Sequence, residues 1–181
     1  MNKLLAVLLT IVSCGNGRVD NVKETPSAKT IDWDETTRIE YRYGDSSLPP
    51  DYHRSYTIAI TDSMKSIVVD SYGKVVLTKK YPNTPAEFQA FKEELSTKGI
   101  KKHKEKKADP CDGGTSETLR LYKGDEMYFY AFVNHCSGES GTLELPYAAS
   151  NFIRSQLPEN VDSLIESTIG NDVEDEVVPE P

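Results

Sequence analysis

The stretch Glu117-Thr-Leu-Arg-Leu-Tyr-Lys-Gly-Asp-Glu-Met-Tyr-Phe-Tyr-Ala-Phe-Val-Asn134 decides the fold of this chain. Two β-rich runs flank Lys123-Gly124-Asp125, which is typical of a tight turn, so the stretch predicts a β-hairpin. The second run, Glu126 to Asn134, has aromatic or apolar residues on both of its faces. A strand with no polar face is expected in the interior of a sheet, and we therefore expect this one to lie centrally.

Four more β-rich runs precede the hairpin. The first, Thr37 to Tyr43, alternates apolar and polar side chains, which indicates a strand with one buried face. Turn or loop residues separate the other three, which are Tyr56 to Thr61, Ser66 to Tyr72 and Val75 to Tyr81. Consecutive strands with short connections are expected to pair as an antiparallel meander. Together with the hairpin, they predict an antiparallel sheet of about six strands.

One helix is strongly indicated after these runs. Thr84-Pro85-Ala86-Glu87 matches a capping box with proline at the first helical position. Phe88, Phe91 and Leu95 then fall on one face, and Gly99 is placed to end the helix in a left-handed conformation. Further helices are expected over Tyr147 to Gln156 and Val161 to Ile169. The predicted fold class is therefore α+β, with one packed helix and one or two C-terminal helices.

The N-terminus has the pattern of a secretion signal. Lys3 precedes the apolar run Leu4 to Val12, which is too short for a membrane-spanning helix of about 20 residues but fits a signal-peptide core. The run closes with Ile11-Val12-Ser13-Cys14. This stretch resembles the type II signal peptide of bacterial lipoproteins, whose lipobox ends in a cysteine. The resemblance implies cleavage after Ser13 and attachment of fatty acids such as palmitate to Cys14.

The same resemblance implies a place in the bacterial cell envelope. Members of these families that stay in the inner membrane commonly have aspartate after the lipidated cysteine, whereas this chain has Gly15, so the outer membrane is expected. Whether the domain faces the periplasm or the outside is left open. The predicted organisation is a signal peptide at 1–13, a lipidated, flexible tether at 14–30, one domain at 31–169 and a disordered acidic tail at 170–181.

The cysteine count is consistent with this organisation. Once Cys14 is assigned to lipid, Cys111 and Cys136 remain, and an oxidising compartment favours a disulfide between them. That bond would close a 26-residue loop and contribute about 3.5 kcal/mol through the unfolded state. A metal site is the alternative, with ligands drawn from Asp109, Cys111, Asp112, His135 and Cys136. Because these residues do not form paired ligands at short spacing, no metal or other cofactor is predicted.

The formal net charge of −8 is unevenly distributed. From residue 31 to residue 157 the chain has 17 lysine and arginine residues against 19 acidic residues. From residue 158 onward it has eight acidic residues and no basic one. A nucleic-acid-binding domain normally carries a basic excess on its folded part. The near-neutral body and acidic end therefore argue against a nucleic-acid partner.

Two segments are candidate binding surfaces. A basic run contains Lys101, Lys102, Lys104, Lys106 and Lys107. It can bind anionic lipid headgroups or polysaccharide, and a solvated loop after the helix is the alternative. The second segment is Tyr52-His53-Arg54, which follows two prolines. Its aromatic residue can contact a partner or anchor the loop.

The sequence carries no recognisable catalytic motif, neither H-E-x-x-H nor a glycine-rich phosphate loop. The favoured function is a noncatalytic envelope lipoprotein that binds a protein or cell-wall partner. A narrower version is an inhibitor of a secreted enzyme, which would present the loop Ser46 to Arg54 or Ser137 to Gly141. The contrasting hypothesis is a small envelope hydrolase that uses carboxylates the sequence does not identify. A concave pocket with two close acids would favour the hydrolase, and an exposed apolar or aromatic patch would favour binding.

Overall fold

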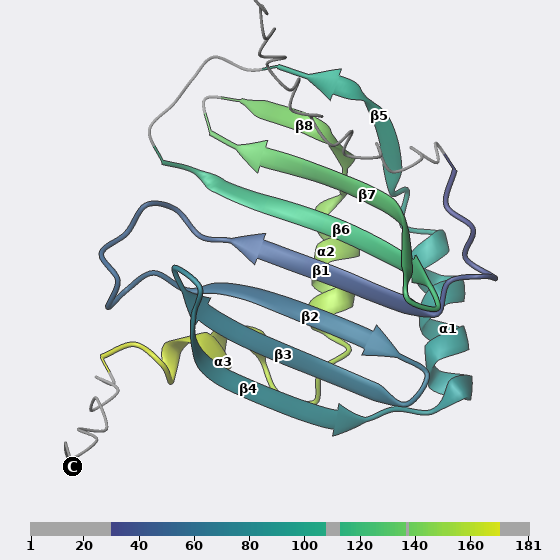
Figure 1. Cartoon of the computed structure of the whole chain (residues 1–181), viewed down its shortest axis with the longest axis horizontal. Helices are drawn as coiled ribbons and strands as arrows, with labels where there is room; N and C mark the ends of the chain where they lie inside the picture. Colours follow the sequence, from purple (N-terminus) through teal and green to yellow (C-terminus); the bar gives the residue numbers. More distant parts are fainter. Residues whose placement is uncertain (1–29, 108–112, 137, 171–181) are drawn as a thin grey trace, which may run out of the picture.

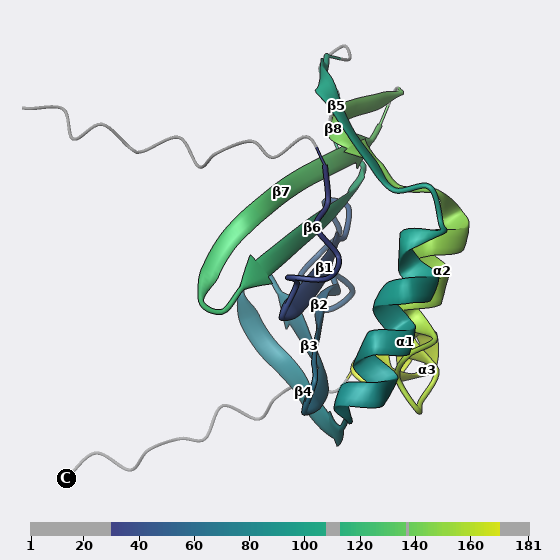
Figure 2. The same cartoon turned by 90° about the vertical axis from the view of Figure 1, so that its right-hand side faces the viewer.

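The computed structural model describes residues 30–107, 113–136 and 138–170. These residues form one antiparallel sheet of eight strands, with three helices on one side of it, as Figure 2 shows. In chain order the elements are β1 (Arg38–Gly44), β2 (Ser55–Thr61), β3 (Met64–Ser71), β4 (Lys74–Pro82), α1 (Pro85–Ser96), β5 (Lys101–Lys106), β6 (Thr115–Lys123), β7 (Glu126–His135), β8 (Glu139–Glu144), α2 (Tyr147–Arg154) and α3 (Val161–Glu166). The predicted α+β class is confirmed, whereas the predicted number of about six strands is wrong.

The strands lie in the order β4-β3-β2-β1-β6-β7-β8-β5, as Figure 1 shows. Strands β1 to β4 form the predicted meander, and β6 and β7 form the predicted hairpin, which joins the meander through the pairing of β6 with β1. Strand β7 lies inside the sheet between β6 and β8, as its two apolar faces predict. The two edge strands are β4 and β5.

The two strands that were not predicted are β5 and β8. The lysine run, for which a loop was the expectation, forms β5 and pairs with β8. Strand β8 in turn occupies most of the stretch 137–141 that was predicted to be a loop. Gly141 has a φ of 121°, and a Cβ atom there would lie 2.3 Å from the backbone oxygen of Phe132 on β7. Neither strand has apolar alternation, so their strand conformation depends on the neighbouring strands rather than on their own residues.

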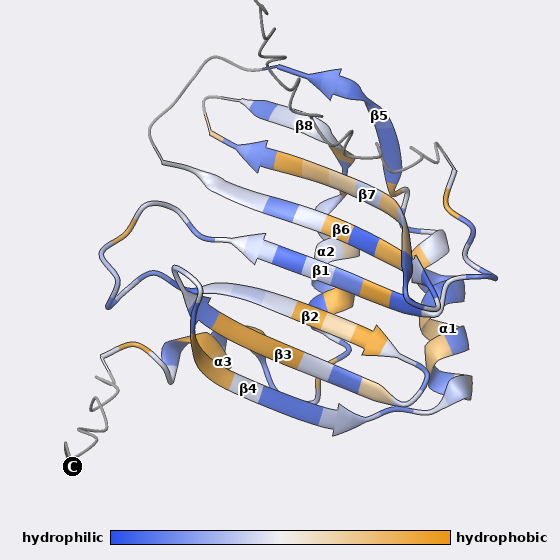
Figure 3. Ribbon diagram, in the orientation of Figure 1, coloured by the Kyte–Doolittle hydropathy of each residue, from blue (hydrophilic) through white to orange (hydrophobic). Residues whose placement is uncertain are grey.

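The core lies between the sheet and the three helices. Strand residues that point toward the helices are buried, and they alternate with residues that point to the other face, which we call the open face. The largest fully buried side chains include Ile39, Tyr41, Ile58, Ile67, Leu119 and Phe129. Figure 3 shows the resulting mixture of apolar and polar positions along β2, β3 and β7. Helix α1 adds Phe88, Phe91 and Leu95 to the core, as predicted.

The predicted N-cap of α1 at Thr84 is present, but the Glu87 carboxylate contacts the Thr84 hydroxyl rather than the Thr84 N–H of a full capping box. The hydroxyl of Thr84 accepts a hydrogen bond from the Glu87 N–H at 3.2 Å and donates one to the Glu87 carboxylate at 2.9 Å. The helix ends at Ser96, and Gly99 beyond it has the predicted left-handed φ, at 77°. Helices α2 and α3 confirm the two predicted C-terminal helices. Among the described residues, no helix has the length and apolar character needed to cross a bilayer.

Several predicted features lie outside the described residues. They are the signal peptide at 1–13, Cys14 and the tether up to residue 29, the residues Asp109, Cys111, Asp112 and Ser137, and the acidic tail at 171–181. These stay predictions.

Candidate binding groove

Three adjoining depressions share Arg154, the last residue of α2. Their volumes are about 270, 350 and 320 Å³. We call the combined depression the Arg154 groove, and the residues most used below are Tyr43, Tyr56, Glu117, His135, Tyr147 and Arg154. The groove runs along the helix-bearing side, where β1 ends, β2 begins and β7 ends, so it collects side chains from distant parts of the sequence.

Two stacked tyrosines form part of the groove wall. Tyr43 on β1 lies directly opposite Tyr56 on β2, and their ring centroids are 5.3 Å apart with an interplanar angle of 20°. Both residues continue the alternation that buries Ile39 and Ile58 on the same strands. The strand register therefore extends the core outward into an aromatic surface, and cross-strand packing limits the motion of the two rings.

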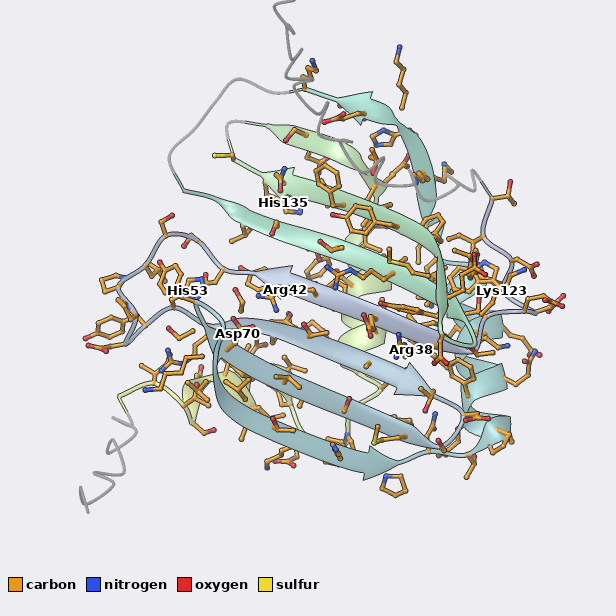
Figure 4. All side chains as sticks on the ribbon, in the orientation of Figure 1. Arg38, Arg42, His53, Asp70, Lys123 and His135 are labelled. Carbon is orange, nitrogen blue, oxygen red and sulfur yellow. The ribbon has the colours of Figure 1, made fainter. Side chains whose placement is uncertain are left out.

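A chain of hydrogen bonds positions His135 in the same groove. The Tyr41 hydroxyl donates to Glu117 Oε1 at 2.6 Å, and His135 Nε2 lies 3.0 Å from Glu117 Oε2. On its other side, His135 Nδ1 lies 3.9 Å from a carboxylate oxygen of Glu139. Figure 4 shows His135 at the end of β7. Both oxygens of Glu117 are thus engaged, which holds the imidazole ring in one orientation.

The phenols of the groove remain protonated over the physiological pH range. Burial raises the pKa of Tyr56 to about 12. The pKa of Tyr41 is also raised, mainly by burial and to a smaller extent by the neighbouring Tyr56 and Glu117. Burial and the nearby Asp45 carboxylate raise the pKa of Tyr43. The phenols that line the groove are therefore neutral hydroxyl groups rather than phenolate anions.

Helix α2 supplies the opposite wall. Tyr147, Asn151 and Arg154 are spaced four and three residues apart, which places them on one face of the helix. The Tyr147 side chain is 78% exposed, and the Arg154 guanidinium pairs with the Asp162 carboxylate of α3. This helix face presents a ring, an amide and a guanidinium, which are planar groups suited to stacking and to directed hydrogen bonds.

The groove brings two carboxylates to one histidine. The hydrogen bonds and ion pairs of the His135 ring go to Glu117 and Glu139, and none goes to a hydroxyl or thiol in the described residues. A hydrogen bond from Lys79 lowers the pKa of Glu159, which also lines the groove, and one from Lys123 lowers the pKa of Asp32 outside it, whereas a general acid needs a raised pKa. In residues 30–107, 113–136 and 138–170, no three His, Cys, Asp or Glu residues are grouped to hold a metal ion.

Hydrogen bonds hold the loop Ser46 to Arg54 in place, and two of its three predicted contact residues are buried rather than exposed. Of the three predicted contact residues, Tyr52 is 58% exposed, but His53 and Arg54 are only 6% and 5% exposed. The Arg54 guanidinium donates to both the backbone oxygen and the hydroxyl of Thr168, at 2.6 and 2.7 Å. Candidate surface residues His53 and Arg54 therefore anchor the loop, because their buried side chains cannot reach a partner.

The groove and the lysine run are separate. Lys101, Lys104, Lys106 and Lys107 are exposed, and Lys102 is partly buried with its ammonium group 5.6 Å from the centre of the Phe129 ring. No lysine of this run lines the Arg154 groove. Tyr52, by contrast, lines one of its three depressions.

The disulfide stays a prediction because Cys111 lies outside the described residues. Cys136 follows β7 directly, and its sulfur atom lies 3.1 Å from the backbone oxygen of Gly113, two residues after Cys111 in the sequence. The stretch Ser137 to Gly141 was predicted to be a loop that an inhibitor could present. This prediction is wrong for Glu139 to Gly141, because these residues belong to β8.

The residues of the groove are not apparent as a site in the sequence. Tyr43 and Tyr56 were assigned to strand packing, and nothing in the sequence pairs Glu117 with His135 across the β6–β7 hairpin. One usable signal was the spacing of Tyr147, Asn151 and Arg154, which predicts a polar face on a helix whose other face is buried.

Comparison with other proteins does not add to this geometry. No family model matches the chain, and no match is found among curated proteins or among solved structures. The function proposed below therefore rests on the residues and their arrangement.

Proposed function

We propose that this chain is a noncatalytic binding module of the bacterial envelope, anchored by lipid on Cys14, and that it binds a polysaccharide strand in the Arg154 groove. The lipobox-like stretch Ile11 to Cys14 supports the anchor. The groove supports the binding role, because its walls combine aromatic rings with planar hydrogen-bonding groups.

The observation that carries the proposal is the pairing of aromatic and planar polar groups in depressions that adjoin one another around Arg154. Their volumes of about 270, 350 and 320 Å³ offer room for more than one sugar unit. The C–H faces of sugar rings pack on aromatic rings such as that of Tyr147, and their hydroxyl pairs accept and donate hydrogen bonds with groups such as Arg154 and Asn151. The lysine run offers neither feature and is a separate surface.

The test of the groove uses the mature chain with Cys14→Ser, titrated with soluble fragments of envelope polysaccharides in a calorimeter. Tyr147→Ala is the main variant, since its exposed side chain can be removed without opening the core. Truncation of an aromatic anchor costs about 2 kcal/mol, so a loss of affinity of about thirtyfold is expected.

Tyr130→Ala is the matched control, because Tyr130 is also an exposed tyrosine, at 39%, but lies on the open face. Its affinity should equal that of the parent chain. Equal binding by the Tyr147→Ala variant would show that the polysaccharide does not occupy the groove.

The anchor is tested on its own. Cys14→Ser in the full chain should abolish labelling by radioactive palmitate and, in high salt that screens contacts between lysines and lipid headgroups, should move the protein from membrane to soluble fractions. Unchanged membrane partition in high salt would rule out a lipoprotein, while leaving the groove experiment valid.

The inhibitor hypothesis remains a second candidate because the loop Ser46 to Arg54 is pre-organised. Its exposed Leu48 and Tyr52 side chains, at 41% and 58%, are held on a backbone fixed by Arg54. Affinity capture from envelope extracts with the parent chain and a Leu48→Asp/Tyr52→Ala variant separates the two functions. A protein partner lost only in that variant would favour the loop over the groove.

The hydrolase hypothesis is tested by incubating the chain with the same polysaccharides and measuring new reducing ends. None is expected, because Tyr41 and His135 engage both oxygens of Glu117, the more buried of the two carboxylates beside His135. Release of reducing ends that is abolished by Glu117→Gln would overturn the noncatalytic assignment.

A further inference from the structure

We propose that edge strand β5 and the apolar pocket beside it form a face that lies against phosphate-bearing lipid headgroups. This face is distinct from the Arg154 groove, and its contact with lipid does not depend on a ligand in the groove. We call it the β5 face, and it consists of Ile31, Trp33, Ile100 and the exposed lysines of the run, which are Lys101, Lys104, Lys106 and Lys107 just after the strand.

The strand conformation of the lysine run is the first argument. A solvated loop would leave the lysines without a fixed arrangement, but β5 holds them along one edge of the sheet, which is blue over most of its length in Figure 3. Lys101, Lys104 and Lys106 are exposed, and the Lys101 side chain reaches 68% exposure. A row of lysines on an edge strand also discourages pairing with other sheets, but this protection does not require five lysines in seven residues.

The other edge strand, β4, serves as a comparison, because its lysines need only protect an edge of the sheet. Strand β4 carries Lys74, Lys79 and Lys80. Lys79 is 2.6 Å from Glu159, and the Tyr81 hydroxyl donates to the same carboxylate at 2.7 Å. Charge on β4 is thus partly neutralised within the domain. On β5, Lys101 lies 3.6 Å from the Glu144 carboxylate, whereas Lys104 and Lys106 have no ion pair within the described residues, in a chain whose net charge is −8.

An apolar pocket adjoins the lysines and adds a second lipid-compatible feature. It has a volume of about 350 Å³ and is lined by Ile31, Trp33, Ile100 and the first two lysines of β5. Trp33 packs partly against the core and is partly exposed. Tryptophan beside lysines suits the boundary between headgroups and acyl chains, because the indole ring is apolar with one hydrogen-bond donor.

The position of the N-terminal segment selects lipid as the occupant. Thr30, the first described residue, lines this same pocket. The described part of the domain therefore begins at the β5 face. This step rests on the lipid proposed for Cys14, which would keep this face within reach of the membrane surface. Lysines near an anionic surface are each attracted by about 1 kcal/mol, which corresponds to about fivefold in partition.

The experiment measures flotation of the mature chain with Cys14→Ser, so that no attached lipid contributes. Vesicles of phosphatidylglycerol and phosphatidylethanolamine are compared with vesicles of phosphatidylcholine at low ionic strength. The parent chain should float with the anionic vesicles and be released by salt. The variant Lys104→Gln/Lys106→Gln/Lys107→Gln should partition about a hundredfold less, at about fivefold for each lysine.

The matched control is Lys74→Gln/Lys79→Gln/Lys80→Gln, which changes the net charge equally on the opposite edge. Its partition should stay close to that of the parent. Trp33, the single tryptophan, gives an independent readout, since lipids with brominated acyl chains should quench its fluorescence.

Three results would overturn the proposal: no flotation with anionic vesicles, an equal loss in the β4 variant, or unquenched Trp33 fluorescence in vesicle-bound protein. Binding of a soluble anionic polysaccharide through β5, without vesicle binding, would reassign the face to that ligand. Because the vesicles contain no polysaccharide, each result is independent of the Arg154 groove.

Discussion

The two faces of the sheet are built from the same strands but are stabilised in different ways. On the helix-covered face, Ile39, Leu121 and Phe129 are at most 1% exposed and pack against the helices. The open face has no helix over it in the described residues, as Figure 2 shows. It carries charged and aromatic side chains instead. Alternation along each strand thus separates an apolar core from a polar surface.

The open face is nevertheless organised. Glu40 accepts a hydrogen bond from the Tyr122 hydroxyl at 2.8 Å and pairs with Arg38 at 3.5 Å and Arg120 at 3.9 Å. The Arg38 guanidinium lies 3.7 Å from the centre of the Tyr122 ring. Figure 4 shows Arg38 and Arg42 on this face. The difference between the faces suggests that burial, rather than the face itself, decides how much each side chain stabilises the fold.

The largest effect is expected from a core residue of β7. Phe129→Ala should lower the free energy of unfolding by about 3–5 kcal/mol, because it removes buried surface and leaves a cavity. Tyr130→Ala, one residue along the same strand but 39% exposed on the open face, should cost about 1 kcal/mol or less. Urea denaturation followed by circular dichroism measures both. Equal losses would show that the two faces contribute alike.

This contrast also marks how far the sequence predicts the structure. Alternation predicted β1 and β2, β-rich runs with turn residues between them predicted β3, β4 and the hairpin, and the capping box predicted the start of α1, because each signal depends on neighbouring residues. Strands β5 and β8 were missed because Lys101–Lys106 and Glu139–Glu144 lack an apolar face and pair only where the sheet provides a partner. The groove was missed for a related reason, since Glu117 and His135 meet only through the register of β6 and β7.

The second-largest effect is expected from an exception on the open face. Asp70 lies on this face, yet its side chain is only 8% exposed, and it accepts hydrogen bonds from Arg42 at 2.9 Å and from the Gly73 N–H at 3.0 Å. Asp70→Asn should lower the free energy of unfolding by about 2 kcal/mol at neutral pH, because hydrogen bonds to a charged group are among the stronger ones.

The stabilisation by the Asp70 carboxylate is lost at acidic pH. Burial acts to raise the pKa of Asp70, but the hydrogen bonds from Arg42 and Gly73 outweigh it and leave the pKa below its usual value of 3.8. The stabilisation by the carboxylate is therefore complete above the unfolded-state pKa, about 3.9, and is lost as the pH falls through the lower folded-state pKa. Unfolding curves of the parent and the variant should converge at acidic pH. A constant difference down to pH 2 would contradict this assignment.

The smallest effect is expected from an ion pair on the helix-covered side of the edge strand β4. Lys79 lies opposite the core residue Ile67 in the strand register, so it belongs to the same side as the core, but the side chains of Lys79 and Glu159 are 37% and 44% exposed. Water and salt screen such a pair, and Lys79→Gln should cost between about 0 and 1 kcal/mol, with the difference shrinking further in high salt. Asp70 is buried on the open side, and Lys79 is exposed on the covered side. Comparing the two variants therefore shows whether the loss of stability follows the burial of a side chain or the face on which it lies. A larger loss for Lys79→Gln than for Asp70→Asn would mean that the face, not burial, determines stability.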